Sequence, residues 1–358
     1  MDITLVGFKD EFNGGVGSGI GRYSFELKNN LLNKKNKIKV IEISPIGKKR
    51  AITQYLGAYK FLFFNRDKTD IMHFISHNPA INSKLLKLEG RTKITIATAI
   101  EFGYLNTFDI SKIGKKEFIS NGFKLKDYLA WHLLQKNLKG TLGADFLIAI
   151  STQTKEEAIQ LGFSKNNIKV INLGIDKRFL GRRLIASSNK FKVGCISSLR
   201  IRKNLEFAIK AINNMGNEVH FEIWGKGPNL DNLKKITKNK NIRFMGFAPE
   251  NRIVDIYDSF DVYVHPTLYT GFELEILEAQ ARGLPVIIYK YGKIPNEVRK
   301  YCFEAESPEH MSQIIENLKE NGYNEKVRKK ATEYARSFTW ERCAKETFKV
   351  YKNIYDNY

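Results

Sequence analysis

The chain has 358 residues, of which 42% are hydrophobic and 27% are charged, so it is long enough for two globular domains of ordinary size. It contains no run of eighteen or more apolar residues, and its first residues resemble a strand rather than a secretory signal. Three widely spaced cysteines indicate neither a disulfide framework nor a zinc site. These features favour a cytoplasmic globular protein over a spanning or secreted one.

The net charge of +21 is the unusual bulk property of the sequence. Such a charge favours polyanionic partners, such as nucleic acids, anionic lipids and phosphorylated small molecules. It is also compatible with a solvated, lysine-rich surface that has no specific partner. No helix-turn-helix, zinc-finger or RNA-binding motif is present, so no specific nucleic-acid partner is expected.

Strand-like and helix-like segments alternate along the first half of the chain. An amphipathic helix is expected over residues 22–32 and a helical region over 123–138. Strands are expected over residues 3–8, 38–43, 71–74, 93–97, 146–150 and 168–171. Such alternation is typical of parallel sheets with crossover helices.

The same alternation restarts after residues 176–190, where a linker is expected. A helix is predicted over residues 204–213, and strands are predicted over 191–196, 219–224, 242–245, 262–264 and 284–288. The sequence therefore predicts two Rossmann-like doubly wound domains that face each other across a cleft. Ligands of such sheets bind outside the carboxyl ends of the strands.

The segment from residue 261 to 288 is the most informative for chemistry. A strand is followed by a loop and by a helix expected to start near Gly271, with Thr270 as a suitable N-cap. The free amides of a helix N-terminus bind anions, and Gly271 permits close approach of a ligand to the backbone. Glu278, two turns into the helix, could accept two hydrogen bonds from a ribose diol. The alternative is that Glu278 is a partly buried helical residue that pairs locally.

This segment resembles the donor-site signature of the family 4 retaining glycosyltransferases. That signature reads Glu-Gly-Phe-Gly, four residues, Glu-Ala and then a Gly-x-Pro-Val strand. The resemblance extends over nearly the whole chain, through the segments 19–23, 144–151, 172–176, 199–204, 270–287 and 338–342. It implies the GT-B fold, with an N-terminal acceptor-side domain over residues 1–178, a donor domain over 179–336 and a C-terminal helix over 337–358 that crosses back to the first domain.

The resemblance also implies roles for single residues. Lys203 matches the lysine that neutralises the departing diphosphate, and Glu278 matches the glutamate that holds the ribose; both are the expected catalytic residues. The remaining expected donor contacts are the amides of the helix start, the flanks of the nucleotide, and a glycine-rich turn of the first domain. They are Gly271, Phe272 and Glu273; Gly225 and Phe247; and Gly19 and Gly21.

The chain departs from the family pattern at four places. Thr270 replaces the first signature glutamate, Glu273 replaces the following glycine, and Ser198 stands where an arginine is usual. Arg202 could reach the diphosphate in place of that arginine, or could lie on the surface. The acceptor-side histidine is also missing after the strand 93–97, where Glu101 is the nearest ionisable residue.

The histidines and carboxylates do not have metal-ligand spacing, and no Asp-x-Asp pair occurs. No metal and no cofactor are therefore expected, apart from the nucleotide sugar as substrate. His73 and His77 lie where a strand end of the first domain is expected, and could contact a ligand there or be structural. His265, before Pro266, is expected to be structural.

The implied activity is hexosyl transfer from a nucleotide diphosphate sugar to a glycan, lipid-linked or small-molecule acceptor, with retention of anomeric configuration. Thr270 and Ser198 motivate an alternative, in which the chain is a catalytically impaired protein that binds sugar nucleotides or glycans. The stretch 110–138 combines lysines with aromatic residues, so it could contact an anionic membrane or form an ordinary amphipathic pair. The donor base, the sugar and the acceptor stay open.

Overall fold

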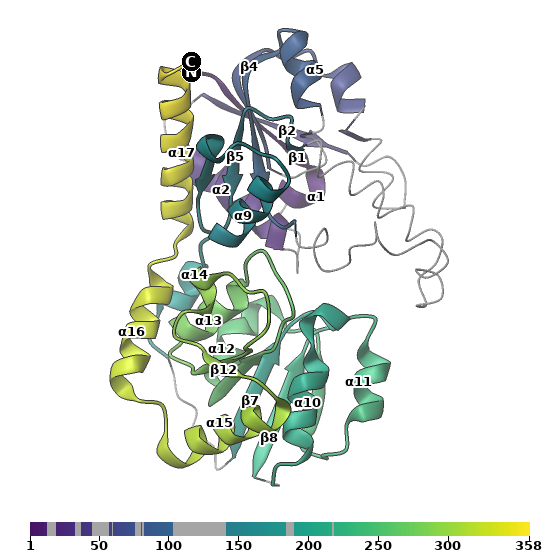
Figure 1. Cartoon of the computed structure of the whole chain (residues 1–358), viewed down its shortest axis with the longest axis vertical. Helices are drawn as coiled ribbons and strands as arrows, with labels where there is room; N and C mark the ends of the chain where they lie inside the picture. Colours follow the sequence, from purple (N-terminus) through teal and green to yellow (C-terminus); the bar gives the residue numbers. More distant parts are fainter. Residues whose placement is uncertain are drawn as a thin grey trace. The chain divides into compact units, whose positions relative to one another are not determined.

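The computed structural model describes residues 1–12, 19–32, 37–44, 57–58, 60–75, 80, 82–102, 141–183, 190–216 and 218–358. The chain divides into two compact units (Figure 1). Unit 1 contains Met1–Gly174 and Trp340–Tyr358, and unit 2 contains Ile175–Thr339. The divisions thus fall after residues 174 and 339, compared with 178 and 336 in the sequence-based prediction. The helical region 123–138 and the lysine-rich stretch 110–138 lie outside the described residues.

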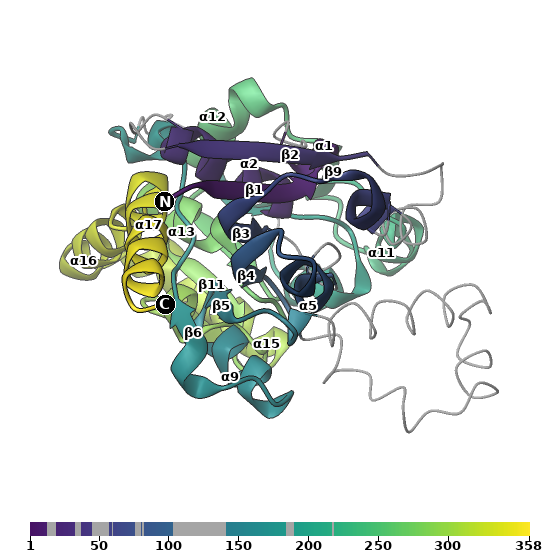
Figure 2. The same cartoon turned by 90° about the horizontal axis from the view of Figure 1, so that it is seen from above.

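Unit 1 is built on a six-stranded parallel sheet with the strand order β2-β1-β3-β4-β5-β6 (Figure 2). The strands are β1 (Ile3–Phe8), β2 (Ile38–Ile43), β3 (Thr69–Phe74), β4 (Thr92–Ala99), β5 (Phe146–Ala149) and β6 (Ile168–Val170). Every side chain of β1 is buried, as a central parallel strand with covered faces requires. Strand β2 lies on one side of β1, and β3 to β6 follow on the other side. The point between β1 and β3, where the strand order changes direction, is the reversal point of this sheet.

Helices cover this sheet, and the C-terminal helix is one of them. They are α1 (Lys9–Phe12), α2 (Gly19–Leu32), α5 (Ser83–Leu88), α9 (Thr152–Gln160) and α17 (Trp340–Asp356), with the 3-10 turn η1 (Lys165–Asn167) before β6. Helix α17 packs on α2 and β3, so the end of the chain belongs to the unit in which the chain begins. Both views place the two chain ends on the same side of unit 1 (Figures 1 and 2).

Unit 2 is built on a second six-stranded parallel sheet with the order β12-β11-β10-β7-β8-β9. Its strands are β7 (Phe191–Ile196), β8 (Val219–Trp224), β9 (Ile242–Gly246), β10 (Val262–His265), β11 (Val286–Tyr289) and β12 (Phe303–Ala305). This is the strand order of the dinucleotide-binding Rossmann sheet, and the order reverses between β7 and β10. Ligands of open parallel sheets bind outside the carboxyl ends of the strands at such a reversal.

The hydrophobic core of unit 2 lies between its sheet and the helices that cover it. They are α10 (Leu205–Asn213), α11 (Leu230–Ile236), α12 (Ile253–Asp258), α13 (Leu274–Ala281), α14 (Asn296–Arg299), α15 (Pro308–Asn321) and α16 (Glu325–Arg336), with the 3-10 turns η2 (Lys177–Leu180), η3 (Ile201–Lys203) and η4 (Glu250–Arg252). Residues 176–183, expected to be part of a linker, belong to unit 2. There, Arg282 donates hydrogen bonds to the carbonyls of Gly181 and Arg182.

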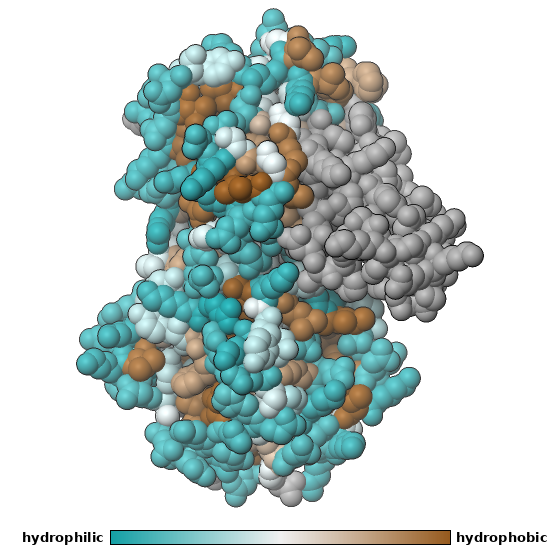
Figure 3. All heavy atoms as spheres, viewed as in Figure 1, coloured by the Kyte–Doolittle hydropathy of each residue, from teal (hydrophilic) through white to brown (hydrophobic). Residues whose placement is uncertain are grey.

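The prediction of two doubly wound parallel α/β domains is confirmed. Strands β1, β2, β7 and β8 have the predicted bounds. Strand β12, of three residues, was not predicted. On the face viewed in Figure 3, hydrophilic residues dominate, with smaller hydrophobic patches between them. None of the helices in the described ranges is both long and apolar enough to cross a membrane.

Candidate functional site

Three loops at the carboxyl ends of β7, β8 and β9 are joined by backbone hydrogen bonds. The amide of Ser197 donates to the carbonyl of Trp224 at 2.9 Å, and the amide of Leu199 donates to the carbonyl of Lys226 at 3.0 Å. The amide of Gly225 donates to the carbonyl of Gly246 at 2.6 Å. The loops that follow three neighbouring strands therefore form one backbone framework beside the reversal point of unit 2.

Gly225 and Gly227 permit this close approach of the loops. Gly225 has a φ of +145°, and a Cβ atom there would lie 1.8 Å from the carbonyl oxygen of Ser197. A Cβ atom on Gly227 would lie 2.3 Å from the carbonyl oxygen of Leu199. Only glycine fits both positions, so the Gly225-Lys226-Gly227 sequence is explained by loop packing, whatever ligand the loop contacts.

Lys203 ends the short turn η3 that follows β7. The next residue, Asn204, has a left-handed conformation with a φ of 52° and immediately precedes α10. An asparagine tolerates this conformation better than most residues because its short polar side chain bonds locally. The sharp turn directs the Lys203 side chain into the interior of unit 2, where only 5% of it is exposed.

The ammonium group of Lys203 is bound by Glu273. Its Nζ atom lies 2.5 Å from Oε1 and 2.7 Å from Oε2 of Glu273, whose side chain is 3% exposed. The two residues are 70 positions apart in the sequence. They meet because Lys203 follows β7 and Glu273 follows β10, the two strands that flank the reversal point. The structure thus joins two residues that the sequence assigned separately to the donor site.

Glu273 is the residue before α13, which corrects two expectations. The helix begins at Leu274 rather than near Gly271, and Thr270 is not its N-cap. Instead, the Thr270 hydroxyl accepts a bond from the amide of Phe272 at 3.3 Å, within a local turn. Serine, threonine and asparagine form such turns as readily as helix caps, so the residue type alone did not distinguish the two.

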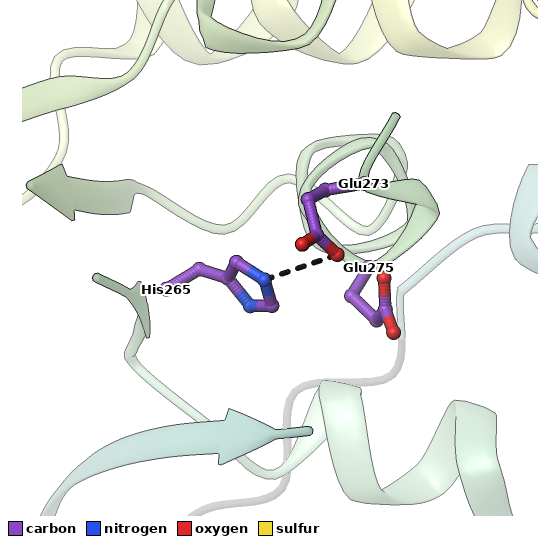
Figure 4. Close-up of side chains that lie close together, drawn as sticks. All are labelled: His265, Glu273 and Glu275. Carbon is purple, nitrogen blue, oxygen red and sulfur yellow. Dashed lines mark ion pairs between the residues drawn. The ribbon is translucent and has the colours of Figure 1, made fainter. Parts of the chain in front are cut away.

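His265 and Thr267 complete the surroundings of Glu273. His265 Nε2 lies 3.3 Å from Glu273 Oε2, and Figure 4 shows the imidazole and the carboxylate facing each other. The Thr267 hydroxyl donates to Glu273 Oε1 at 3.5 Å. Burial alone would raise the pKa of Glu273, but the charge and hydrogen bonds of Lys203, together with the neighbouring imidazole of His265, lower this pKa well below the ordinary value. Glu273 is therefore an ionised carboxylate in the interior.

Glu275 lies one position into α13, beside this cluster (Figure 4). Burial, followed by the negative charge of Glu273, raises the pKa of Glu275 to about 7. Among the described residues, His265, Glu273 and Glu275 have potential ligand atoms that all lie within 4.8 Å of one another. Lys203 already supplies a cation to both oxygens of Glu273, so a metal ion would have to displace it.

Glu278, the expected ribose-binding residue, is buried on α13. Its Oε2 atom accepts a hydrogen bond of 2.9 Å from the hydroxyl of Tyr257 on α12. Burial and the neighbouring negative charge of Glu278 raise the pKa of Tyr257 well above the ordinary value, so the phenol stays protonated and donates. Tyr257 was missed in the sequence because no local motif connects it to Glu278, which lies 21 residues later.

The other expected donor contacts of unit 2 lie on the same loops with different exposures. Ser198 is half-buried. The Arg202 guanidinium donates to the carbonyl of Tyr269 at 3.4 Å and lies over its ring, so it is attached to the loop after β10. Phe247, after β9, is 47% exposed. Gly271 is buried and Phe272 half-buried, and the ring of Phe272 lies 6.2 Å from that of Phe338.

Gly19 and Gly21 lie in unit 1, in the first turn of α2, and follow β1 at the reversal point of that sheet.

His73, on β3 of the same unit, is fully buried, as the structural interpretation requires. Its Nδ1 lies 2.6 Å from the hydroxyl of Tyr351, and its Nε2 lies 2.8 Å from the hydroxyl of Thr98. His77 lies outside the described residues.

Two hollows of unit 2, of about 420 and 610 Å³, lie elsewhere, along α15. Both are lined by the amide side chains of Gln313, Asn317 and Asn321, and neither includes a residue of the reversal point. The candidate site is defined by its buried charges and by the sheet topology of unit 2.

Comparison with known proteins agrees with the sheet topology. Residues 190–321, within unit 2, match the family described as Glycosyl transferases group 1. The structures of HepE from Anabaena in complex with UDP and of sucrose-phosphate synthase from Thermosynechococcus elongatus have TM-scores of 0.70 and 0.79. The matches cover 99% and 100% of this chain and 100% of each of those chains, at 16% and 15% identity. The chain therefore has the GT-B fold of two Rossmann-like domains.

The curated relatives match this chain over part of its length. O-antigen chain mannosyltransferase B of Escherichia coli is 22% identical over 242 residues, which are 61% of this chain and 64% of that protein. An uncharacterized glycosyltransferase of Methanocaldococcus jannaschii is 26% identical over 231 residues, 58% of this chain and 59% of that protein. The chain thus spans about three fifths of the length of these relatives.

Proposed function

We propose that the chain is a glycosyltransferase that moves a sugar from a nucleoside diphosphate sugar to an acceptor hydroxyl. The observation that carries this proposal is the position of Lys203 and Glu278 in unit 2. Lys203 follows β7, and Glu278 lies on the helix after β10, so they flank the reversal point of a Rossmann sheet. This is where sheets of this order bind nucleotides. The match of residues 190–321 to Glycosyl transferases group 1 supports the same activity.

The donor nucleotide would bind along the loops of unit 2. Glu278 would accept hydrogen bonds from the ribose hydroxyls, with Gly225 and the exposed ring of Phe247 beside the ribose and base. Lys203 and the backbone amides that precede α13 would bind the diphosphate, because an ammonium group and backbone N–H groups both donate hydrogen bonds to an anion. HepE, which shares the fold, is described in complex with UDP-glucose.

The reaction would proceed with retention at the anomeric carbon. The acceptor hydroxyl attacks this carbon on the face from which the nucleoside diphosphate leaves. The bond to the diphosphate oxygen breaks, and a phosphate oxygen takes the hydroxyl proton. Lys203 would stabilise the charge that develops on the leaving diphosphate. This route needs neither a metal ion nor a protein nucleophile, and its acceptor would be a glycan, a lipid-linked sugar or a small molecule.

A direct experiment is to incubate the protein with UDP-, GDP- and ADP-sugars and candidate acceptors, and to follow release of the nucleoside diphosphate. Proton coupling constants of the product would then report the anomeric configuration. We expect one nucleotide base to be preferred. A donor whose anomeric bond to the diphosphate is axial should give a product whose new glycosidic bond is also axial. Inversion would exclude the retaining route, whereas absence of turnover with binding intact would favour the second candidate.

That second candidate is a catalytically impaired protein that binds a sugar nucleotide or a glycan. The observation that favours it is the Lys203–Glu273 ion pair, because the lysine needed for the leaving group already has an anionic partner. Thr270, in place of a glutamate, favours it as well. Turnover of any donor, as hydrolysis or transfer, would exclude it.

A further inference from the structure

The Lys203–Glu273 pair raises a problem for any diphosphate that binds at the reversal point. Two of the three N–H bonds that an ammonium group offers are directed at the carboxylate of Glu273. Both side chains are at least nine-tenths buried. Separating such a pair leaves two charges in the interior, which is costly unless another group replaces the lost partner.

The charges around the pair add to this problem. Glu275 and Glu278 follow on the same helix, and Tyr257 and Tyr263 face them from α12 and β10. Lys203 and His265 are the cationic or ionisable basic groups that act on Glu273 and Glu275. A diphosphate that approached this cluster would meet a lysine whose charge Glu273 already balances, so Lys203 would attract it less than a lysine without a carboxylate partner would.

We propose that Glu273 is an internal competitor of the donor diphosphate: its carboxylate holds Lys203 in the free protein and must leave the lysine when a diphosphate binds. The inference rests on the proposed function. Glu273 is thus a positioning residue that acts through Lys203. It keeps the buried lysine in place while the site is empty, and it weakens the hold of the site on the nucleoside diphosphate product.

The chemistry of the two anions supports this exchange. A carboxylate and a phosphate both accept charge-assisted hydrogen bonds from an ammonium group, so one can replace the other on Lys203 without leaving the cation unpaired. The carboxylate of Glu273 has a second partner within reach, because His265 Nε2 lies 3.3 Å away. Thr267 also donates to it. The displaced carboxylate would therefore retain polar contacts.

The test is a double-mutant cycle measured by titration calorimetry with UDP, GDP, ADP and inorganic pyrophosphate. The four proteins are the wild type, Glu273→Gln, Lys203→Met and the double variant. Glutamine has the shape of glutamate without its charge, so Glu273→Gln should bind the preferred diphosphate about tenfold or more tightly than the wild type. In the Lys203→Met background the same substitution should change the affinity little, because the competition has been removed.

Two further variants separate competition from general damage. Glu273→Asp has a shorter carboxylate that reaches Lys203 less well, so its affinity should lie between those of the wild type and Glu273→Gln. Asp258→Asn disturbs another buried ion pair of unit 2, in which Arg282 Nη2 lies 2.6 Å from Asp258 Oδ2. It should lower thermal stability without tightening diphosphate binding.

The outcomes distinguish this inference from the proposed function. If UDP, GDP or ADP binds the wild type, and Glu273→Gln and Glu273→Asp both bind it equally or more weakly, the inference is wrong while the proposed function stands. A gain of equal size in the Lys203→Met background would also overturn the inference, because the effect would not pass through Lys203. If no nucleotide and no pyrophosphate binds any of the proteins, both proposals fail.

Discussion

Glu273 holds Lys203 through both carboxylate oxygens, at 2.5 and 2.7 Å, in a site where neither side chain is more than 5% exposed. The pair joins the ends of two strands at the reversal point of unit 2. A buried ion pair of this kind is more costly to break than to replace as a whole. It should therefore stabilise unit 2 and, under our proposal, weaken its affinity for a diphosphate.

Lys203→Met should lower the free energy of unfolding by about 3 kcal/mol or more, because it leaves the Glu273 carboxylate buried without its ammonium partner. The double variant Lys203→Met/Glu273→Gln should recover much of this loss, since neither charge remains. Denaturation by urea, followed by circular dichroism, measures both effects. If the loss of unfolding free energy in the double variant equals the sum of the losses in the two single variants, the two side chains do not stabilise each other.

Glu275 should make the stability of unit 2 depend on pH. Its pKa is raised to about 7 in the folded protein from an ordinary value of 4.5. The folded state therefore keeps a proton that the unfolded state has released, and stability is lost as the pH rises from the ordinary value to about 7. Between pH 5 and pH 8 the melting temperature of the wild type should fall more than that of Glu275→Gln. Parallel curves would contradict this pKa.

Much of the fold could be predicted from the sequence because parallel strands and amphipathic helices have strong local periods. Strand β7 was predicted to the residue, and its partner β10 within one residue. The contacts of the site were not predictable in the same way. Lys203 and Glu273 are 70 residues apart, and their pairing depends on which strands become neighbours. The resemblance to known donor sites identified both positions but did not indicate that they bind each other.

The start of α13 shows how a local pattern can mislead. Thr270 has the residue type of an N-cap, but its hydroxyl bonds within a turn and the helix begins four residues later. Likewise, Tyr257 bonds Glu278 from another helix, and no spacing rule connects them. Long-range polar contacts of this kind follow from tertiary packing, which periodicity does not encode.

Tyr257→Phe should weaken nucleoside diphosphate binding several-fold, because Glu278 loses the hydrogen bond that fixes its carboxylate. Stability should fall by about 1 kcal/mol, as expected for one hydrogen bond. Calorimetry with the preferred nucleotide and a thermal melt measure the two effects. Tyr291→Phe, at an exposed tyrosine, is the control. Unchanged affinity in Tyr257→Phe would mean that the tyrosine does not position Glu278 for binding.

A series of hydrogen-bonded side chains, Tyr351–His73–Thr98–Tyr23, should fasten α17 to β3, β4 and α2 within unit 1. Its three hydrogen bonds are 2.6, 2.8 and 3.0 Å long, and all four residues are buried. Tyr351→Phe should speed hydrogen exchange in residues 340–356, while Tyr358→Phe, at an exposed position, should not. Equal exchange in the two variants would exclude this role for Tyr351.

Burial lowers the pKa of His73 to about 3, so the folded protein holds this histidine neutral. The unfolded chain takes up a proton near the ordinary value of 6.5. The stability that depends on the neutral ring is therefore present above this value and is lost as the pH falls toward 3. His73→Asn should show a smaller loss of melting temperature between pH 7 and pH 4 than the wild type. A larger or equal loss would contradict the neutral, buried state.

Gly225→Ala should disrupt the loop framework, since its Cβ atom would lie 1.8 Å from the carbonyl oxygen of Ser197 at a φ of +145°. We expect a loss of several kcal/mol in stability together with loss of nucleotide binding. Gly216→Ala is the matched control, because a Cβ atom there meets no atom within 4 Å. Equal melting temperatures for the two variants would contradict the close approach of the loops.

The reversal point of unit 2 should bind a nucleoside diphosphate through Glu278 and Lys203. This binding is tested most directly by calorimetric titration of the wild type and Glu278→Ala with UDP, GDP and ADP. One of these nucleotides should bind the wild type with a stoichiometry of one, and Glu278→Ala should bind it about tenfold or more weakly. Binding of none of them to the wild type, or equal binding to both proteins, would contradict the claim.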